Sequence, residues 1–89
     1  SKLNHIKENH AIVNKGGKTY TLESYIVLFQ RPYYVSVQAG SNQQFTLNEA
    51  SEIAVEYIKP RGCTDAVSRR TDLDRSNSDK TQWIIGVEC

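Results

Sequence analysis

The side chains in this sequence with the most reactive chemistry are two cysteines, Cys63 and Cys89, and two histidines, His5 and His10. A cysteine nucleophile needs a nearby base, and nothing in the sequence positions either imidazole beside Cys63. The spacing of the four residues also resembles no zinc-ligand pattern, and no serine-hydrolase, phosphate-loop or zinc-protease motif is present. We therefore expect no enzyme, no metal site and no cofactor. A small thiol- or metal-dependent enzyme that uses Cys63 is the alternative.

The two cysteines instead predict an intramolecular disulfide between Cys63 and Cys89. Cys89 is the last residue and directly follows an apolar segment, and chain ends fray unless something fastens them. Closing this loop would stabilise the fold by about 3 to 4 kcal/mol, because the cross-link restricts the unfolded chain. Such a contribution is large for a domain this small. The alternative is two free thiols in a reducing cytosol.

A disulfide favours an exported protein, in the periplasm, in the cell envelope or outside the cell. The chain has no Asn-x-Ser/Thr sequon, so nothing in it indicates a eukaryotic secretory route, and we expect a bacterial setting. The longest apolar run covers residues 25–29. A membrane-spanning helix needs about 20 apolar residues, and we therefore expect no transmembrane segment.

Residues 72–79 place side-chain oxygens at several nearby positions, as calcium loops do. The EF-hand pattern requires glycine at its sixth position and glutamate at its twelfth. This chain has Asn77 and Trp83 there, and Arg75 and Lys80 add positive charge. We interpret the segment as part of a long polar loop, residues 64–80, and not as a metal site.

Three arginines in that loop, Arg69, Arg70 and Arg75, define an alternative function. They could bind an acidic partner, or nucleic acid if the protein were a cytosolic regulatory or nucleic-acid-associated domain. The net charge of the chain is only +1, and acidic residues are interspersed among the arginines. A nucleic-acid footprint usually carries a clear excess of positive charge, so nucleic acid is not the favoured partner.

The element that organises the chain is an amphipathic helix predicted over residues 47–59. Thr46 can cap its first turn, and Glu49, three residues later, can complete a capping box. Apolar residues then recur at helical spacing through Ile58. Pro60 ends the helix, because proline cannot continue the backbone ladder.

Other segments predict β-strands, because they are apolar throughout or alternate between apolar and polar side chains. They are residues 11–13, 19–22, 25–29, 33–39 and 81–88. Gly16 and Gly17 lie between the first two and indicate a hairpin turn. Residues 25–29 are apolar on both faces, which predicts the central strand of the sheet. Residues 1–10 follow neither pattern, and we expect a flexible arm.

These elements predict one α+β domain over residues 1–89, in the order β-β-β-β-α-β. The helix would cover one face of an antiparallel sheet of four or five strands. The other face of the central strand would need the N-terminal arm, the long loop or another molecule over it, and the last of these would be another protein or a second copy. Arg31, Tyr33 and Tyr34 lie at its margin, and tyrosine and arginine are enriched at binding hot spots. We therefore expect a non-enzymatic interaction or structural accessory module, with Arg69, Arg70 and Arg75 as further interface candidates.

Overall fold

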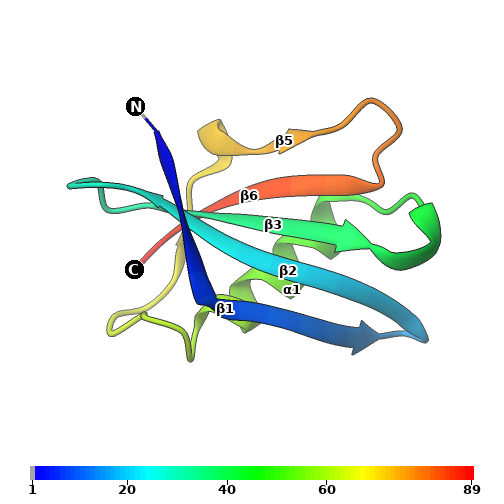
Figure 1. Ribbon diagram of the computed structural model, residues 1–89, viewed down its shortest axis with the longest axis horizontal. Helices are drawn as coiled ribbons and strands as arrows, with labels where there is room; N and C mark the ends of the chain where they lie inside the picture. The colour runs from blue at the N-terminus through cyan, green and yellow to red at the C-terminus, as the bar shows by residue number, and fades with distance from the viewer. Residues whose placement is uncertain (1) are drawn as a thin grey trace.

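The computed structural model describes residues 2–89 and shows an antiparallel sheet with one helix behind it (Figure 1). Four strands are long: β1 (Leu3–Lys15), β2 (Lys18–Val27), β3 (Tyr33–Ala39) and β6 (Gln82–Glu88). Two short strands, β4 (Ser68–Arg69) and β5 (Arg75–Ser76), also pair with β6. The sheet order is β1-β2-β3-β6-β4, with β5 on β6 as well. The predicted α+β class is confirmed.

The helix α1 (Leu47–Ile58) starts with the capping box that the sequence predicts. The Glu49 amide donates to Thr46 Oγ1 at 3.2 Å, and the Thr46 amide donates to Glu49 Oε1 at 2.9 Å. The Thr46 hydroxyl also donates to Glu49 Oε1, at 3.1 Å. The bonds from the Thr46 amide and hydroxyl favour the ionised carboxylate and lower the pKa of Glu49. The predicted helix is one residue too long, because Lys59 is its C-cap.

The hydrophobic core lies between α1 and the sheet. The helix contributes buried residues at helical spacing, namely Ala50, Ile53, Ala54, Tyr57 and Ile58. The strands contribute every second residue, namely Tyr20 and Leu22 from β2, Val35, Val37 and Ala39 from β3, and Ile85 and Val87 from β6. Because strand side chains alternate between faces, the residues that lie between these core positions point away from the helix.

The predicted hairpin joins β1 to β2. Lys15 pairs with Lys18, and Gly16 and Gly17 form the two-residue turn between them. Their φ angles are +60° and +78°, the left-handed values that a type I′ turn needs at both positions and that glycine adopts without strain.

The expectation of a flexible arm at residues 1–10 is wrong for the described residues, because β1 already begins at Leu3. This half of β1 pairs with the end of β2, with Leu3 opposite Val27. The pairing register then shifts between Ile6 and Ala11. A bulge of this kind breaks the alternation by which a strand is recognised in a sequence. Ser1 lies outside the described residues.

The central strand of the sheet is β3, and the prediction that residues 25–29 form it is wrong. Those residues and the predicted strand 19–22 belong largely to one continuous strand, β2, which lies between β1 and β3. β2 ends at Val27, and the Gln30 amide donates to the Val27 carbonyl at 3.0 Å to close a turn. The apolar pair after Val27 therefore lies in this turn, where Leu28 is 58% exposed and Phe29 fully exposed.

Residues 64–80 are not the plain polar loop that we expected, because they run along β6 and contain β4, a 3-10 turn η2 (Thr71–Leu73) and β5. Gly86 of β6 is the point of closest approach. A Cβ atom at Gly86 would lie 2.4 Å from the Arg70 carbonyl oxygen and 2.7 Å from Leu73 Cβ. The two-residue strands are too short to give a periodic pattern, so the sequence does not reveal them.

We predict that Gly86→Ala destabilises the protein by about 1 to 3 kcal/mol, because the added methyl group must displace η2. Urea unfolding followed by circular dichroism measures the change. Gly40→Ala is the matched control, because a Cβ there would lie 3.2 Å from the Thr19 carbonyl oxygen, a much milder contact. Equal unfolding midpoints for the two variants would contradict the packing of η2 on β6.

Candidate functional site: the open face of the sheet

The face of the sheet opposite α1 carries a row of three rings. Figure 1 looks onto this face, with α1 behind the strands. His5 of β1 pairs with Tyr25 of β2, which pairs with Tyr34 of β3, which pairs with Gly86 of β6. The His5 and Tyr25 ring centroids are 5.1 Å apart with the planes 32° from parallel. We call His5, Tyr25 and Tyr34 the aromatic row. The turn η2, which lies over Gly86, borders this row.

Glu23 lies beside the aromatic row and binds two imidazoles. His5 Nε2 is 2.6 Å from Glu23 Oε1, and His10 Nδ1 is 2.5 Å from Glu23 Oε2. The bonds from His5 and then His10 lower the pKa of Glu23, because both favour the ionised carboxylate. The imidazoles approach different carboxylate oxygens, and among residues 2–89 no three His, Cys, Asp or Glu side chains are grouped to hold a metal ion. The cluster is a hydrogen-bonded clamp between β1 and β2.

The bulge in β1 makes this clamp possible. His5 and His10 are five residues apart, so in a regular strand they would point to opposite faces. The bulge between Ile6 and Ala11 changes this parity. Bulges commonly redirect a side chain next to functional sites. Sequence reasoning did not group His5, His10, Glu23 and Tyr25. The only indication of the group in the sequence is that two histidines lie close together in it.

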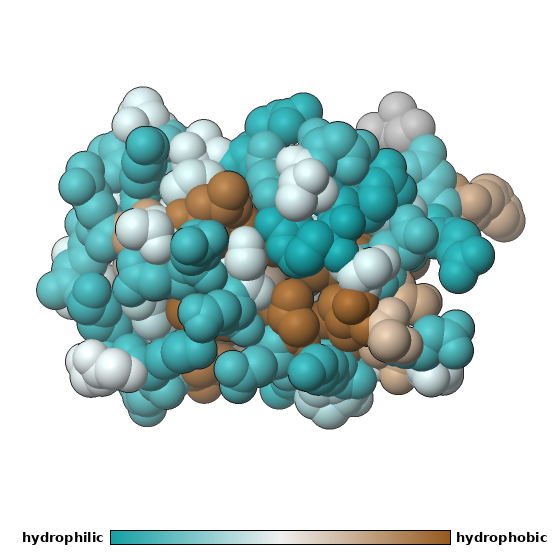
Figure 2. Space-filling view, turned by 180° about the vertical axis from the view of Figure 1, so that it is seen from behind, coloured by the Kyte–Doolittle hydropathy of each residue, from teal (hydrophilic) through white to brown (hydrophobic). Residues whose placement is uncertain are grey.

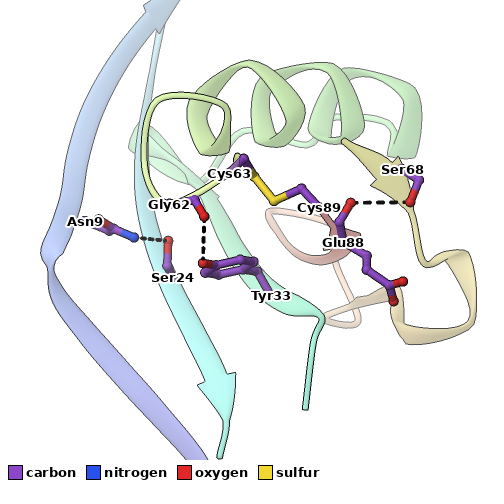
Figure 3. The surroundings of a disulfide bond; sticks show 8 residues. All are labelled: Asn9, Ser24, Tyr33, Gly62, Cys63, Ser68, Glu88 and Cys89. Carbon is purple, nitrogen blue, oxygen red and sulfur yellow. Dashed lines mark hydrogen bonds between the residues drawn. A yellow bond between two sulfur atoms is a disulfide. The ribbon is translucent and has the colours of Figure 1, made fainter. Parts of the chain in front are cut away.

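The adjacent tyrosines separate, one to each face. Tyr34 joins the aromatic row, whereas Tyr33 packs against the core on the helix side. The Tyr33 hydroxyl donates to the Gly62 carbonyl at 3.3 Å, next to Cys63 (Figure 3). Arg31 is exposed just before β3. Of the interface candidates near β3, therefore, only Tyr34 lies within the open face.

The predicted Cys63–Cys89 disulfide is present, with a Cα–Cα distance of 5.4 Å. It joins the segment that follows α1 to the residue after β6 (Figure 3). Beside it, Ser68 Oγ donates to the Glu88 carbonyl at 3.3 Å. Because the Cys63 sulfur is bonded to Cys89, it is not available as the thiol nucleophile of the alternative enzyme hypothesis.

The three loop arginines bond to acidic groups and carbonyls of their own segment and of β6. Arg69 Nη2 pairs with Asp74 Oδ2 at 2.6 Å, and the Asp74 side chain is only 8% exposed. Arg70 bonds to Asp72 and to Glu88 at 3.0 and 3.1 Å. The contacts with Asp72 and then Glu88 raise the pKa of Arg70 further above its already high value.

Arg75 uses its guanidinium in the same way. Its Nη1 donates to the Asp74 carbonyl at 2.8 Å and to the Asp72 carbonyl at 3.3 Å. The positive charge of this loop is therefore largely met within the chain. Binding of nucleic acid through Arg69, Arg70 and Arg75 gains no support from this arrangement.

We predict that Glu23→Gln removes an acid-sensitive part of the stability. The pKa of Glu23 is lowered in the fold, so its contribution is present above the ordinary value of 4.5 and is lost as pH falls through the lower folded value. Urea midpoints measured from neutral to acid pH should differ between wild type and variant at neutral pH and converge in acid. The double variant His5→Gln, His10→Gln should show the same convergence. A difference that stays constant with pH would contradict the clamp.

Comparison with known proteins identifies no relative. No protein-family model, no curated protein and no solved structure matches this chain. Within the part of the chain that the structure describes, no helix is long and apolar enough to cross a membrane. The function must therefore be argued from the geometry of the domain.

Proposed function

We propose that this chain is a small exported domain without catalytic activity that binds another protein through the open face of its sheet. The observation that carries the proposal is the aromatic row. Its rings lie side by side on a face that α1 does not cover, and they are flanked by polar groups of Glu23 and His10. Tyrosine combines a large apolar surface with a hydroxyl group, which is why it is enriched at protein interfaces.

The surroundings of the aromatic row also suit a binding surface. Side chains on a strand pair are held at fixed spacing by the ladder, so the row presents its rings with little conformational freedom. Rigid aromatic groups lose little entropy when they bind. The clamp of Glu23 restrains His5 in the same way. We infer that this face binds a folded surface of another protein, with a second copy of the chain as the alternative partner.

The disulfide supports the exported setting of the proposal. Disulfides persist in oxidising compartments and are rare in the cytosol, and Cys63–Cys89 fastens the C-terminus of the chain. We therefore propose a bacterial periplasm, cell envelope or extracellular location.

We predict that reducing the disulfide destabilises the protein by about 3 to 4 kcal/mol, because the 26-residue separation of the cysteines restricts the unfolded chain. Unfolding in urea with and without a thiol reductant measures the difference. The protein purified under non-reducing conditions should have an intact mass two hydrogens below the reduced value and should resist alkylation. Two alkylated thiols on the native protein would contradict the exported setting.

Site-specific photo-cross-linking tests the binding face. Tyr34 is replaced by p-benzoylphenylalanine in cells that produce the protein, and Glu52, exposed on the outer side of α1, is replaced in the same way as a control. Irradiation should give a discrete cross-linked product at position 34 and none at position 52. Mass spectrometry then distinguishes another protein from a second copy of the chain. The same products at both positions, or none at either, would overturn the proposal for this face.

A further inference from the structure

The turn between β2 and β3 carries an apolar group in an unfavourable position. The Phe29 side chain is fully exposed, with a relative accessibility of 104%, and its φ angle is +67°. A residue with a Cβ atom is strained in this left-handed region, and an aromatic ring is stabilised by leaving water. Two unfavourable features in one residue of a short turn are a reason to look for a function.

Two other exposed apolar residues accompany Phe29 at this end of the molecule. Leu28 is 58% exposed and Leu3, whose partner in the ladder is Val27, is 46% exposed. We call Leu3, Leu28 and Phe29 the apolar tip. Figure 1 shows that the turn projects beyond the sheet, and Figure 2 shows an apolar protrusion at the same end. Lys2 and Arg31 flank the tip, and residues 24–34 contain no acidic residue, so the tip is apolar with a positive border.

The opposite end of the molecule carries a hollow of matching character. It has a volume of about 380 Å³. It is lined by the segment that leads into α1, by the first turn of α1 and by residues around the start of β6, namely Gln44, Phe45, Thr46, Leu47, Glu49, Lys80 and Trp83. Leu47 at its edge is 38% exposed. We call it the Trp83 hollow. It lies where β6 begins and α1 starts, at the end of the long axis remote from the β2–β3 turn (Figure 1).

We propose that the apolar tip of one molecule inserts into the Trp83 hollow of a second copy. Leu47 and Trp83 offer an apolar lining to Phe29. Glu49 at the rim, whose Oε1 accepts from Thr46, offers its second carboxylate oxygen to Arg31. The partner is a second copy and not a bilayer, because one contact then covers every large hydrophobic side chain exposed in residues 2–89 except Ile12, whereas a bilayer would cover the tip alone. This contact is separate from the aromatic row and does not depend on its role.

The positions of the two surfaces decide the form of the assembly. A tip at one end and a hollow at the other give a head-to-tail contact, which extends into a linear chain of molecules and does not close into a two-fold dimer. The contact is small, and small interfaces associate weakly. The chains are therefore expected at high protein concentration and should dissociate on dilution.

Sedimentation equilibrium from about 20 µM to about 1 mM tests the proposal. The weight-average mass of the wild type should rise with concentration beyond that of a dimer. Phe29→Asn should stay monomeric, and because asparagine tolerates a left-handed φ and Phe29 packs against nothing, this variant should be at least as resistant to urea. Leu47→Lys, which places a positive charge in the hollow opposite a positive tip, should also stay monomeric.

Mixing the two variants gives the decisive result. Phe29→Asn keeps an intact hollow and Leu47→Lys keeps an intact tip, so an equimolar mixture should form a one-to-one dimer and nothing larger. The emission of Trp83, the only tryptophan, should shift on mixing. Ile12→Ser removes an exposed apolar side chain elsewhere, 64% exposed on β1, and should assemble as the wild type does.

Three outcomes would overturn the proposal. A wild type that stays monomeric throughout the range lacks the contact. Equal assembly of Phe29→Asn and wild type would place the contact elsewhere. A wild type that does not self-associate but binds vesicles containing anionic lipid, while Phe29→Asn does not, would show that the tip inserts into membranes instead. Failure of the Tyr34 cross-link would leave this inference untouched, because the tip and the aromatic row are different surfaces.

Discussion

A hydrogen bond between two buried hydroxyl groups joins α1 to β2, and through the bulge of β1 it determines how the open face is built. Ser24 of β2 and Tyr57 of α1 are almost fully buried, and their oxygens are 2.6 Å apart. Burial raises the pKa of Tyr57, and its hydroxyl donates a hydrogen bond to the Asn9 carbonyl in the bulge of β1. Buried polar groups without partners are costly, so this arrangement requires the bulge. The bulge in turn brings His10 to the face that carries His5 and Glu23. The open face thus depends on a bond made on the other side of the sheet.

The two edges of the sheet are protected in different ways, and neither kind of protection covers the open face. At β6, the Gly86 amide donates to Asp74 Oδ1 at 3.0 Å and the Gly86 carbonyl accepts from Arg69 Nη1 at 2.8 Å, where no strand residue is opposite. The Gly86 carbonyl also accepts from the Arg70 amide at 2.9 Å, so this amide and the Arg69–Asp74 ion pair together complete the ladder between β4 and β5. At β1 the outer edge has no such cover, but a bulge interrupts it, and lysines lie along it. Charged side chains and bulges are the usual protection of an edge against unspecific pairing. Tyr25 and Tyr34 of the aromatic row lie between these edges, on strands with a neighbour on each side, and His5 lies on the edge strand β1.

The features that sequence reasoning predicted are those set by local chemistry. The capping box of Thr46 and Glu49 gives the start of α1, and the two glycines give the hairpin. The alternating apolar residues of β3 and β6 give the core face, and the disulfide follows from the position of Cys89. The features that it missed depend on contacts between distant segments. Glu23 and Ser24 interrupt the apolar pattern of β2, because their partners come from β1 and α1. Adjacent strand residues point to opposite faces, but the inward position of Tyr33 depends on Gly62, which the chain brings there only after the helix ends.

The C-terminus, where Cys89 forms the disulfide with Cys63, lies at the end of the molecule from which the β2–β3 turn projects (Figure 1). The covalent bond is therefore close to the base of the apolar tip. Tyr33 begins β3, directly after the turn, and its hydroxyl bonds to Gly62 beside Cys63. The base of the turn is therefore held by a segment that the cross-link fastens to the end of β6. An apolar group on a rigid support loses less conformational entropy on binding than one on a mobile loop. The cross-link accordingly stabilises more than the C-terminus: it also supports the strand from which Leu28 and Phe29 are presented.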